Sequence, residues 1–251
     1  MSYLIAVTGK GGVGKTTLSA LIVKQLIANG KSPVLAIDAD PNSCLDETLG
    51  VKADSTVGRA REEVRDEAAD AAKNGISKQE LLNLKISESL VESNGFDLIA
   101  MGRPEGAGCY CYANNVLKSV IAEISKDYPY VVLDNEAGLE NISRHLVQKV
   151  DLLVFVSDGS NSGLKTIIRL YELAKEMGIV YNKLLLVINR LRGAEPPSKI
   201  EEIKAVCGAD DMICLPDDAE VAEFAEANKN FLTLPDDNPI VSKIDELVKA
   251  L

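Results

Sequence analysis

A glycine-rich run near the start of the chain, Gly9-Lys10-Gly11-Gly12-Val13-Gly14-Lys15-Thr16-Thr17, combines the residue types that bind a phosphate group. Successive glycines let backbone N–H groups turn toward one point, and a following helix presents its positive N-terminus to the same point. Lys15 supplies a charge for the phosphates, and the Thr16 hydroxyl supplies a ligand for Mg²⁺. The spacing G-x-x-x-x-G-K-[ST] therefore predicts a site for a nucleoside triphosphate.

The residues on both sides of this loop have the patterns of a strand and a helix. Residues 3–8 form a short apolar run that is typical of a buried strand. After the loop, apolar residues from Leu18 to Leu26 recur at helical spacing, and Asn29-Gly30 is a helix stop signal. Strand, loop and helix thus come in the order that the motif requires. A glycine-rich turn without a ligand is the alternative, but it leaves both lysines unexplained.

Three aspartates follow apolar, strand-like runs. Asp38 and Asp40 come after residues 32–37, and Asp134 ends the run 130–134. In an open parallel sheet, ligands bind just beyond the carboxyl ends of the strands. Carboxylates at this edge can hold the Mg²⁺ shell and position an attacking water. A turn role is the simpler alternative for these aspartates.

Strand-like runs alternate with helical patterns along nearly the whole chain. This alternation predicts a doubly wound, mainly parallel α/β sheet with helices on both faces. The length of 251 residues, without a linker or repeat, predicts a single domain over 1–251. Strands are expected at 3–8, 32–37, 96–101, 130–134, 152–156, 183–188 and, weakly, 211–215, and helical patterns at 56–93, 113–126, 162–177, 197–206, 217–227 and 239–250.

The charge balance and the lack of a long apolar run limit the classes of partner. The net charge is −11, and the most basic stretches, 59–65 and 190–192, are short. Acids interrupt the first of them, so we expect no nucleic-acid partner. No run of 18 apolar residues occurs, and residues 1–3 lack a charged leader pattern, which predicts a soluble cytoplasmic protein without a membrane partner. The amphipathic segment 239–251 carries both charge signs and is expected to pack on the core.

The chain has five cysteines, and two of them are candidate metal ligands. Cys109 and Cys111 lie in a glycine-rich stretch, and thiols at i and i+2 can bind one soft metal. A closed thiolate site needs four ligands, which two such loops across a two-fold axis would supply. Core cysteines on a strand and a redox disulfide are the alternatives. The other three, Cys44, Cys207 and Cys214, have apolar neighbours and are expected to be buried.

The loop with its second lysine resembles the deviant Walker A motif K-G-G-x-G-K-[ST]-[ST] of the MinD, ParA, arsenite-pump and nitrogenase iron-protein ATPases. The resemblance implies a P-loop ATPase that forms a nucleotide-dependent homodimer, with Lys10 reaching the nucleotide of the opposite subunit. It implies that Asp38 and Asp40 form switch I, with Asp40 positioning the attacking water. It also implies that 134–138 is switch II, with Asp134 in the Mg²⁺ shell. A solvated loop lysine is the alternative for Lys10.

Two later segments resemble the base-binding parts of the same family. Val187-Ile188-Asn189-Arg190 is similar to its adenine segment V-x-N-[KR], and Leu215-Pro216-Asp217-Asp218 is similar to a loop that flanks the base. An asparagine amide offers a donor and an acceptor to a base edge. Because no N-K-x-D guanine pattern occurs, ATP is favoured over GTP. The candidate catalytic residues are Lys10, Lys15 and Asp40, and the candidate ATP- and Mg²⁺-binding residues are Gly11, Gly12, Val13, Gly14, Lys15, Thr16, Thr17, Asp38, Asp134, Asn189, Arg190 and Pro216.

The stretch Gly108-Cys109-Tyr110-Cys111 further resembles the CooC-type nickel-insertion ATPases of carbon monoxide dehydrogenase maturation. This resemblance implies a Ni²⁺ or Zn²⁺ site between subunits, formed by Cys109 and Cys111, and apo-carbon monoxide dehydrogenase as the client. One alternative is an iron–sulfur reductase or scaffold ATPase, although switch II and the C-terminal segment contain no cysteine. The other is a MinD- or ParA-type spatial organiser, for which we find no basic surface or membrane helix.

Overall fold

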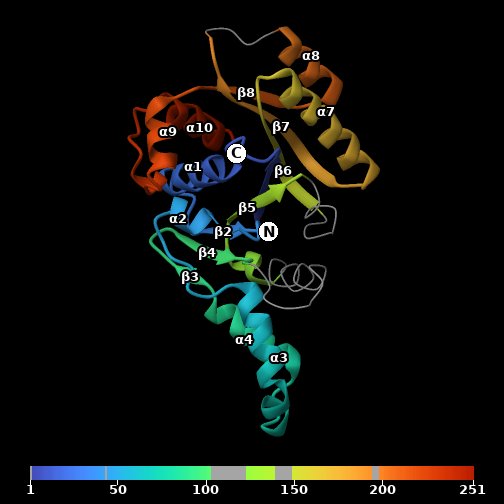
Figure 1. Ribbon diagram of the computed structural model, residues 1–251, viewed down its shortest axis with the longest axis vertical. Coiled ribbons are helices and arrows are strands. Elements are labelled where there is room, and N and C mark those ends of the chain that lie inside the picture. Colours follow the sequence, from blue (N-terminus) through green and yellow to red (C-terminus); the bar gives the residue numbers. More distant parts are fainter. Residues whose placement is uncertain (1, 43, 103–122, 139–148, 194–197) are drawn as a thin grey trace.

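The computed structural model describes residues 2–42, 44–102, 123–138, 149–193 and 198–251, and in them the chain forms one eight-stranded sheet (Figure 1). The strand order is β3-β4-β2-β5-β1-β6-β7-β8, and every described pair is parallel except β3 with β4. The strands are β1 (Tyr3–Gly9), β2 (Val34–Asp38), β3 (Val91–Glu92), β4 (Phe96–Ala100), β5 (Tyr130–Ala137), β6 (Lys149–Asp158), β7 (Val180–Leu191) and β8 (Asp211–Pro216).

Helices cover both faces of this sheet. The described helices are α1 (Lys15–Ala28), α2 (Leu45–Thr48), α3 (Val57–Lys73), α4 (Lys78–Glu88), α7 (Asn161–Glu176), α8 (Ser198–Cys207), α9 (Ala219–Glu226) and α10 (Pro239–Lys249), with short 3₁₀ turns at Ser125–Asp127 and Phe231–Thr233. Neighbouring strand residues point to opposite faces. In β1, accordingly, Ile5 and Val7 pack in the core with α1 and α10, whereas Leu4 and Ala6 pack with α3, α4, α7 and α8. The doubly wound α/β fold is confirmed.

The central strands end together at one edge of the sheet. Val7 of β1 lies opposite Asp134 of β5 and Val154 of β6, and Asp38 of β2 lies opposite Asp134. Because these strands are parallel, the segments that follow them leave from the same edge. The glycine-rich loop and the three aspartates therefore belong to one region of the molecule.

Helices α3 and α4 form a hairpin that extends away from the sheet (Figure 1). The Thr56 side chain accepts a hydrogen bond from the Arg59 N–H and caps α3, and a Ser77–Glu80 capping box begins α4. At the root of the hairpin, the Gly58 N–H donates to Met101 O at 2.9 Å. The Met101 N–H in turn donates to Asp38 O at 2.8 Å, so backbone bonds connect the hairpin to the end of β2.

Most elements lie where the sequence places them. The expected strands correspond to all of the described ones except β3, whose two residues are too short to form a periodic pattern. The C-terminal helix α10 buries Ile240, Val241, Ile244 and Val248 in the same core as α1, which confirms the packing expected for it. Most of the expected helix at 113–126 lies outside the described residues. Among the described helices, none has the length and apolar character needed to cross a membrane.

Candidate nucleotide-binding site

The glycine-rich loop needs its glycines for conformation and for close packing. Gly12 and Gly14 have φ angles of 75° and 94°, in the left-handed region that favours glycine. A side chain at Gly9 would come within 2.2 Å of Val156 O on the neighbouring strand. The loop between β1 and α1 thus has the compact shape that brings backbone N–H groups toward one point.

Lys15, the first residue of α1, is buried and its ammonium group turns back over the loop. Its Nζ lies 3.4 Å from Lys10 O and donates to it, and the residue is 8% exposed. A buried ammonium group is costly unless a negative group lies close to it. The phosphates of a nucleotide in the loop would supply that charge, and α1 would present its positive end to them.

Asp134, on β5, is buried beside two hydroxyl groups of α1. Its Oδ1 accepts a hydrogen bond from Ser19 Oγ at 3.2 Å, and the Thr16 hydroxyl also hydrogen-bonds to the carboxylate. Burial, together with the charge of Asp38, raises the pKa of Asp134 to about 7, although Lys15 acts against the shift. The sequence analysis did not predict Ser19 as a site residue. It lies one helical turn after Thr16 and therefore faces the same side of α1.

Asp38 fixes the chain that follows β2. Its Oδ1 accepts from the Asp40 N–H at 3.0 Å, and its Oδ2 accepts from the N–H groups of Cys44 and Leu45, each at 2.9 Å. Burial is the main cause that raises the pKa of Asp38 to about 6, and the charge of Asp40 adds to it. The carboxylate thus fixes the backbone of the segment that is predicted to be switch I.

The two buried carboxylates fit a divalent cation. Asp38 and Asp134 lie opposite each other on neighbouring strands. Burial raises the pKa of both carboxyl groups, and the charge of Asp38 raises the pKa of Asp134 further. A hard cation between oxygen ligands would relieve both effects. The Thr16 hydroxyl and the Asp134 carboxylate are the oxygen donors that Mg²⁺ would use here.

Asp40 lies half-buried in the loop that follows β2. Its Oδ1 accepts from the Asn42 N–H at 2.8 Å and from Asn42 Nδ2 at 3.0 Å, which is the geometry of an Asx turn. The turn chemistry expected as the simpler alternative is therefore present. Its position next to Asp38 also places it at the edge where the nucleotide would bind, and its role with water stays a prediction.

Asn189 and Arg190 contact the phosphate loop, which the sequence prediction did not include. The β7–β8 register shifts between Ile188 and Leu191, so these two residues form an irregularity at the strand end. Asn189 Nδ2 donates to Val13 O at 2.8 Å, and Arg190 Nη1 donates to Gly12 O at 3.2 Å. Arg190 has a φ of 53°, an uncommon value for a residue with a side chain. The segment predicted to bind the base therefore also supports the loop that would bind the phosphates.

Pro216 and Lys10 lie at two sides of this region. Pro216 ends β8 and lies opposite Leu191 in the sheet, beside the irregular β7 end. Lys10 is exposed, and its charge contributes to lowering the pKa of Asp158, after the Ser160 hydroxyl. Asp158 was missed, although it ends the apolar run of β6 as Asp134 does that of β5.

The segment 134–138, predicted as switch II, is hydrogen-bonded to the end of β1, where the phosphate loop begins. Asn135 Nδ2 donates to Val7 O at 3.0 Å. The Gly138 N–H donates to Gly9 O at 3.0 Å, and Gly138 O accepts from Thr8 Oγ1 at 2.5 Å. With a φ of 90°, Gly138 needs the freedom of glycine. This segment is therefore bonded to Gly9, the residue at which the phosphate loop begins.

The candidate metal ligands Cys109 and Cys111 lie outside the described residues. Across the part of the chain that the structure describes, no group of three or more His, Cys, Asp or Glu side chains could hold a metal ion. Cys207 is buried and Cys214 is half-buried, but Cys44 is exposed. The expectation of a buried Cys44 is wrong because this residue lies in the turn before α2, where its N–H bonds to Asp38 and its side chain faces outward.

Comparisons with known proteins agree with this geometry. Residues 4–231 match the CobQ/CobB/MinD/ParA nucleotide binding domain. An uncharacterized ATP-binding protein of Methanocaldococcus jannaschii is 40% identical over 99% of this chain and 98% of its own length. The carbon monoxide dehydrogenase accessory protein CooC of Rhodospirillum rubrum is 32% identical over 70% of each chain. The structure of the MinD protein of Pyrococcus horikoshii, solved with Mg-ADP, matches with a TM-score of 0.70 at 19% identity. The match covers 100% of this chain and 96% of that protein. The chain belongs to the CobQ/CobB/MinD/ParA family of nucleotide-binding proteins and is a P-loop ATPase.

Proposed function

We propose that this ATPase is a dimerising metallochaperone that holds Ni²⁺ or Zn²⁺ between two subunits and assists nickel insertion into carbon monoxide dehydrogenase. The observation that carries the proposal is the pair Cys109 and Cys111, two soft ligands at i and i+2 in a chain with a CooC relative. Two copies would supply four thiolates, the number that a closed tetrahedral site needs.

The nucleotide site supplies the energy for the proposed cycle. Lys15, the loop N–H groups and the N-terminus of α1 bind the phosphates, and Thr16 and Asp134 hold Mg²⁺. Bound Mg²⁺ supplies positive charge that neutralises the β- and γ-phosphate oxygens. Asp40 positions the attacking water. Lys10, which is exposed at the loop, reaches the nucleotide of the partner subunit, so that turnover requires the dimer.

Contacts at the two switch segments connect this site with the rest of the chain. Asp38 accepts three backbone hydrogen bonds from residues 40–45, and Gly138 bonds to Thr8 and Gly9 at the end of β1, where the loop begins. Gain or loss of the γ-phosphate and of Mg²⁺ changes the charge beside both segments. The geometry of a dimer that contacts these segments would change with it, and so would the spacing of thiolates contributed by the two subunits.

Metal analysis of cysteine variants tests the proposal. Cys109→Ala and Cys111→Ala should each lose the metal of the dimer and the dimerisation that metal induces, while ATP turnover per nucleotide-bound dimer persists. Cys44→Ala is the matched control, because Cys44 is an exposed cysteine that is not part of the C-x-C pair. Metal content and light scattering are measured with and without ADP or ATP. Parental metal content in the Cys109 and Cys111 variants would refute the interface site.

A MinD- or ParA-type positioning ATPase is the second candidate. Its support is the family match and the similarity of the fold to MinD. Such a protein would bind neither Ni²⁺ nor Zn²⁺ and would attach to vesicles or DNA in an ATP-dependent way. Sedimentation with anionic vesicles and with plasmid DNA, in the presence of ATP or ADP, separates the two candidates. A visible absorbance band would instead indicate an iron–sulfur protein.

A further inference from the structure

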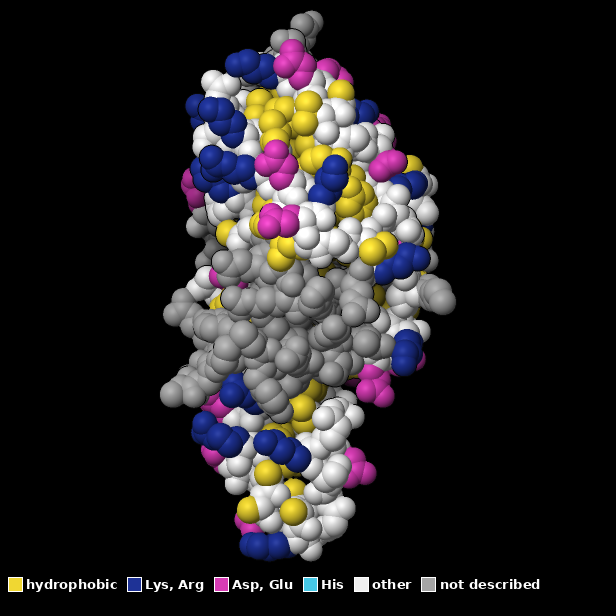
Figure 2. Space-filling model, turned by 90° about the vertical axis from the view of Figure 1, so that its right-hand side faces the viewer, with side chains coloured by type: hydrophobic (Ala, Val, Ile, Leu, Met, Phe, Trp, Pro, Cys, Tyr) yellow, Lys and Arg dark blue, Asp and Glu magenta, His cyan; other side chains and the backbone are white. Residues whose placement is uncertain are grey.

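Helix α7 carries charged side chains along one exposed stripe, which consists of Lys165, Arg169, Glu172 and Glu176. Their spacing of four, three and four residues places them on the same side of the helix. Figure 2 views the molecule from the side of α7 and α8, and its upper half shows side chains of both charge signs beside hydrophobic ones. The stripe is therefore accessible to a partner.

The charges of this stripe are unfavourable for an isolated helix. Lys165 and Arg169 are like charges at i and i+4, which destabilises a helix. Glu172 and Glu176 repeat the same unfavourable spacing, and Glu176 ends the helix, where the dipole favours a cation. Within the described residues, none of the four side chains forms an ion pair. A partner with the complementary charges would relieve both repulsions.

The stripe is complementary to a second copy of itself that runs antiparallel. Arg169 and Glu172 lie at equal distances from the midpoint of the stripe, and the same holds for Lys165 and Glu176. A two-fold axis through this midpoint places Arg169 opposite the partner's Glu172. The same axis places Lys165 opposite the partner's Glu176, and symmetry forms each pair twice. Every charge of the stripe thus faces an opposite charge.

We infer that α7 is an interface at which two copies of this chain associate through antiparallel α7 helices. The ion pairs between the two stripes fix the direction and the alignment of the helices. Leu173, which is 38% exposed, lies beside the stripe and adds an apolar contact. An interface that is one helix long and held by surface charges is weak and sensitive to salt.

This arrangement differs from the nucleotide-dependent dimer of the proposed function. β6 ends at Asp158 and α7 begins at Asn161, so the N-terminus of α7 lies at the carboxyl edge of the sheet. The phosphate loop with Lys10 lies at the same edge. Antiparallel α7 helices turn the carboxyl edges of the two copies in opposite directions, which separates the two phosphate loops. The inference therefore goes beyond the proposed function and does not depend on it.

Charge-reversal variants test the inference in buffer that contains EDTA and no nucleotide. Sedimentation velocity of the full chain at low salt should show a concentration-dependent dimer, and added NaCl should weaken it. Arg169→Glu and Glu172→Arg should each raise the dissociation constant about tenfold, because each creates two pairs of like charges. An equimolar mixture of the two variants should dimerise again, because one chain then carries two glutamates where the other carries two arginines.

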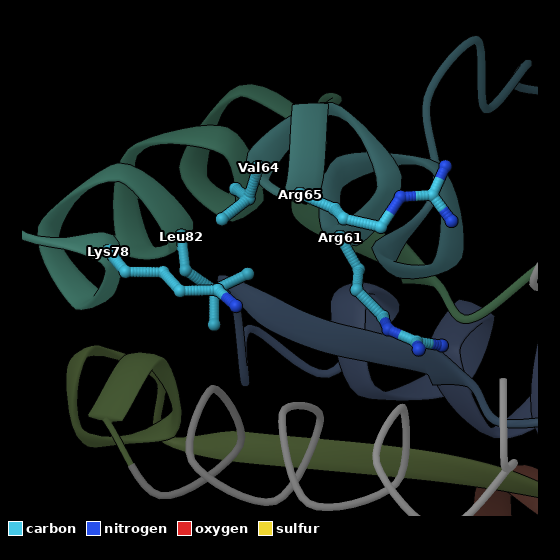
Figure 3. Close-up of a pocket in the computed structure, with 5 residues that line it drawn as sticks. All are labelled: Arg61, Val64, Arg65, Lys78 and Leu82. Atoms are coloured by element: carbon cyan, nitrogen blue, oxygen red, sulfur yellow. The ribbon is translucent and has the colours of Figure 1, made fainter. Parts of the chain in front are cut away.

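Lys78→Glu is the matched control, because it makes the same change of charge at another exposed side chain. Figure 3 shows Lys78 on the α3–α4 hairpin, and Figure 1 places this hairpin at the opposite end of the molecule from α7. The control should associate with the parental dissociation constant.

A parent chain that stays monomeric over the concentration series would overturn the inference. So would a mixture that dimerises no better than either variant alone, or a Lys78→Glu control that weakens association as much as Arg169→Glu. Lys165→Glu and Glu176→Lys form a second pair for the same mixing test if either variant of the first pair fails to fold. Because the assay contains neither nucleotide nor metal, failure of the proposed metal site would leave its result unchanged.

Discussion

Replacing Asp134 with asparagine should stabilise the metal-free protein at alkaline pH while removing its response to Mg²⁺. Asp134 is 1% exposed, and its hydrogen-bond partners are the hydroxyls of Ser19 and Thr16. A hydroxyl can donate or accept, so an asparagine amide keeps both contacts. Asp134→Asn therefore removes a buried charge while keeping a hydrogen-bonding group beside both hydroxyls.

The size of the effect follows from the pKa of this carboxyl group, which burial and Asp38 raise from 3.8 to about 7. The unfolded chain releases this proton near its ordinary pKa, whereas the native state keeps it until the higher one. The free energy of unfolding of the metal-free parent therefore falls as the pH rises from about 4 to about 7. Each pKa unit corresponds to about 1.36 kcal/mol, and part of the shift is shared with Asp38. Above about pH 7, the free energy of unfolding of the parent is therefore lower by about 2 to 4 kcal/mol.

Urea unfolding in EDTA measures the effect at about pH 5 and about pH 8. The variant should be the more stable protein at the higher pH, and its advantage should shrink at the lower pH. In buffer without EDTA, added Mg·ADP should stabilise the parent and much less the variant, because the parent alone has both carboxylates. Asp237→Asn, at an exposed position, is the control and should change little. A variant no more stable than the parent at about pH 8 would refute the reasoning.

Further substitutions test the loop and the core. Lys15→Ala should abolish ATP turnover, because the phosphates lose a buried positive partner, and phosphate release at the parental rate would contradict that role. Gly14→Ala should lower the free energy of unfolding by about 2 kcal/mol, because its φ is positive and the new carbon would lie 2.5 Å from Asn189 Nδ2. Calorimetry should also show weaker ATP binding, and unchanged binding and stability would argue against the Asn189 contact. Leu21→Ala, at 1% exposure, should cost about 3 kcal/mol in urea unfolding, and a loss under about 1 kcal/mol would mean that the α1 core collapses around the cavity.

The sequence was sufficient for elements that have a strong local pattern. Buried parallel strands are apolar on both faces, so β1 and β5 could be predicted from their residues alone. The contact between Asn189 and Val13 could not, because it joins segments far apart in the chain and depends on an irregular strand end.

The pairing of β1 also determines when the nucleotide site can form during synthesis on the ribosome. β1 is the first strand of the chain, yet its sheet neighbours are β5, beginning at Tyr130, and β6, with Leu152 opposite Ile5. Until those strands have emerged, β1 lacks both neighbours and its apolar residues are open to chaperones. The charge of Lys15 acts on Asp134 only after this late assembly. A nucleotide can therefore bind only chains whose central sheet is complete. ATP should not protect nascent chains truncated before β6 from proteolysis.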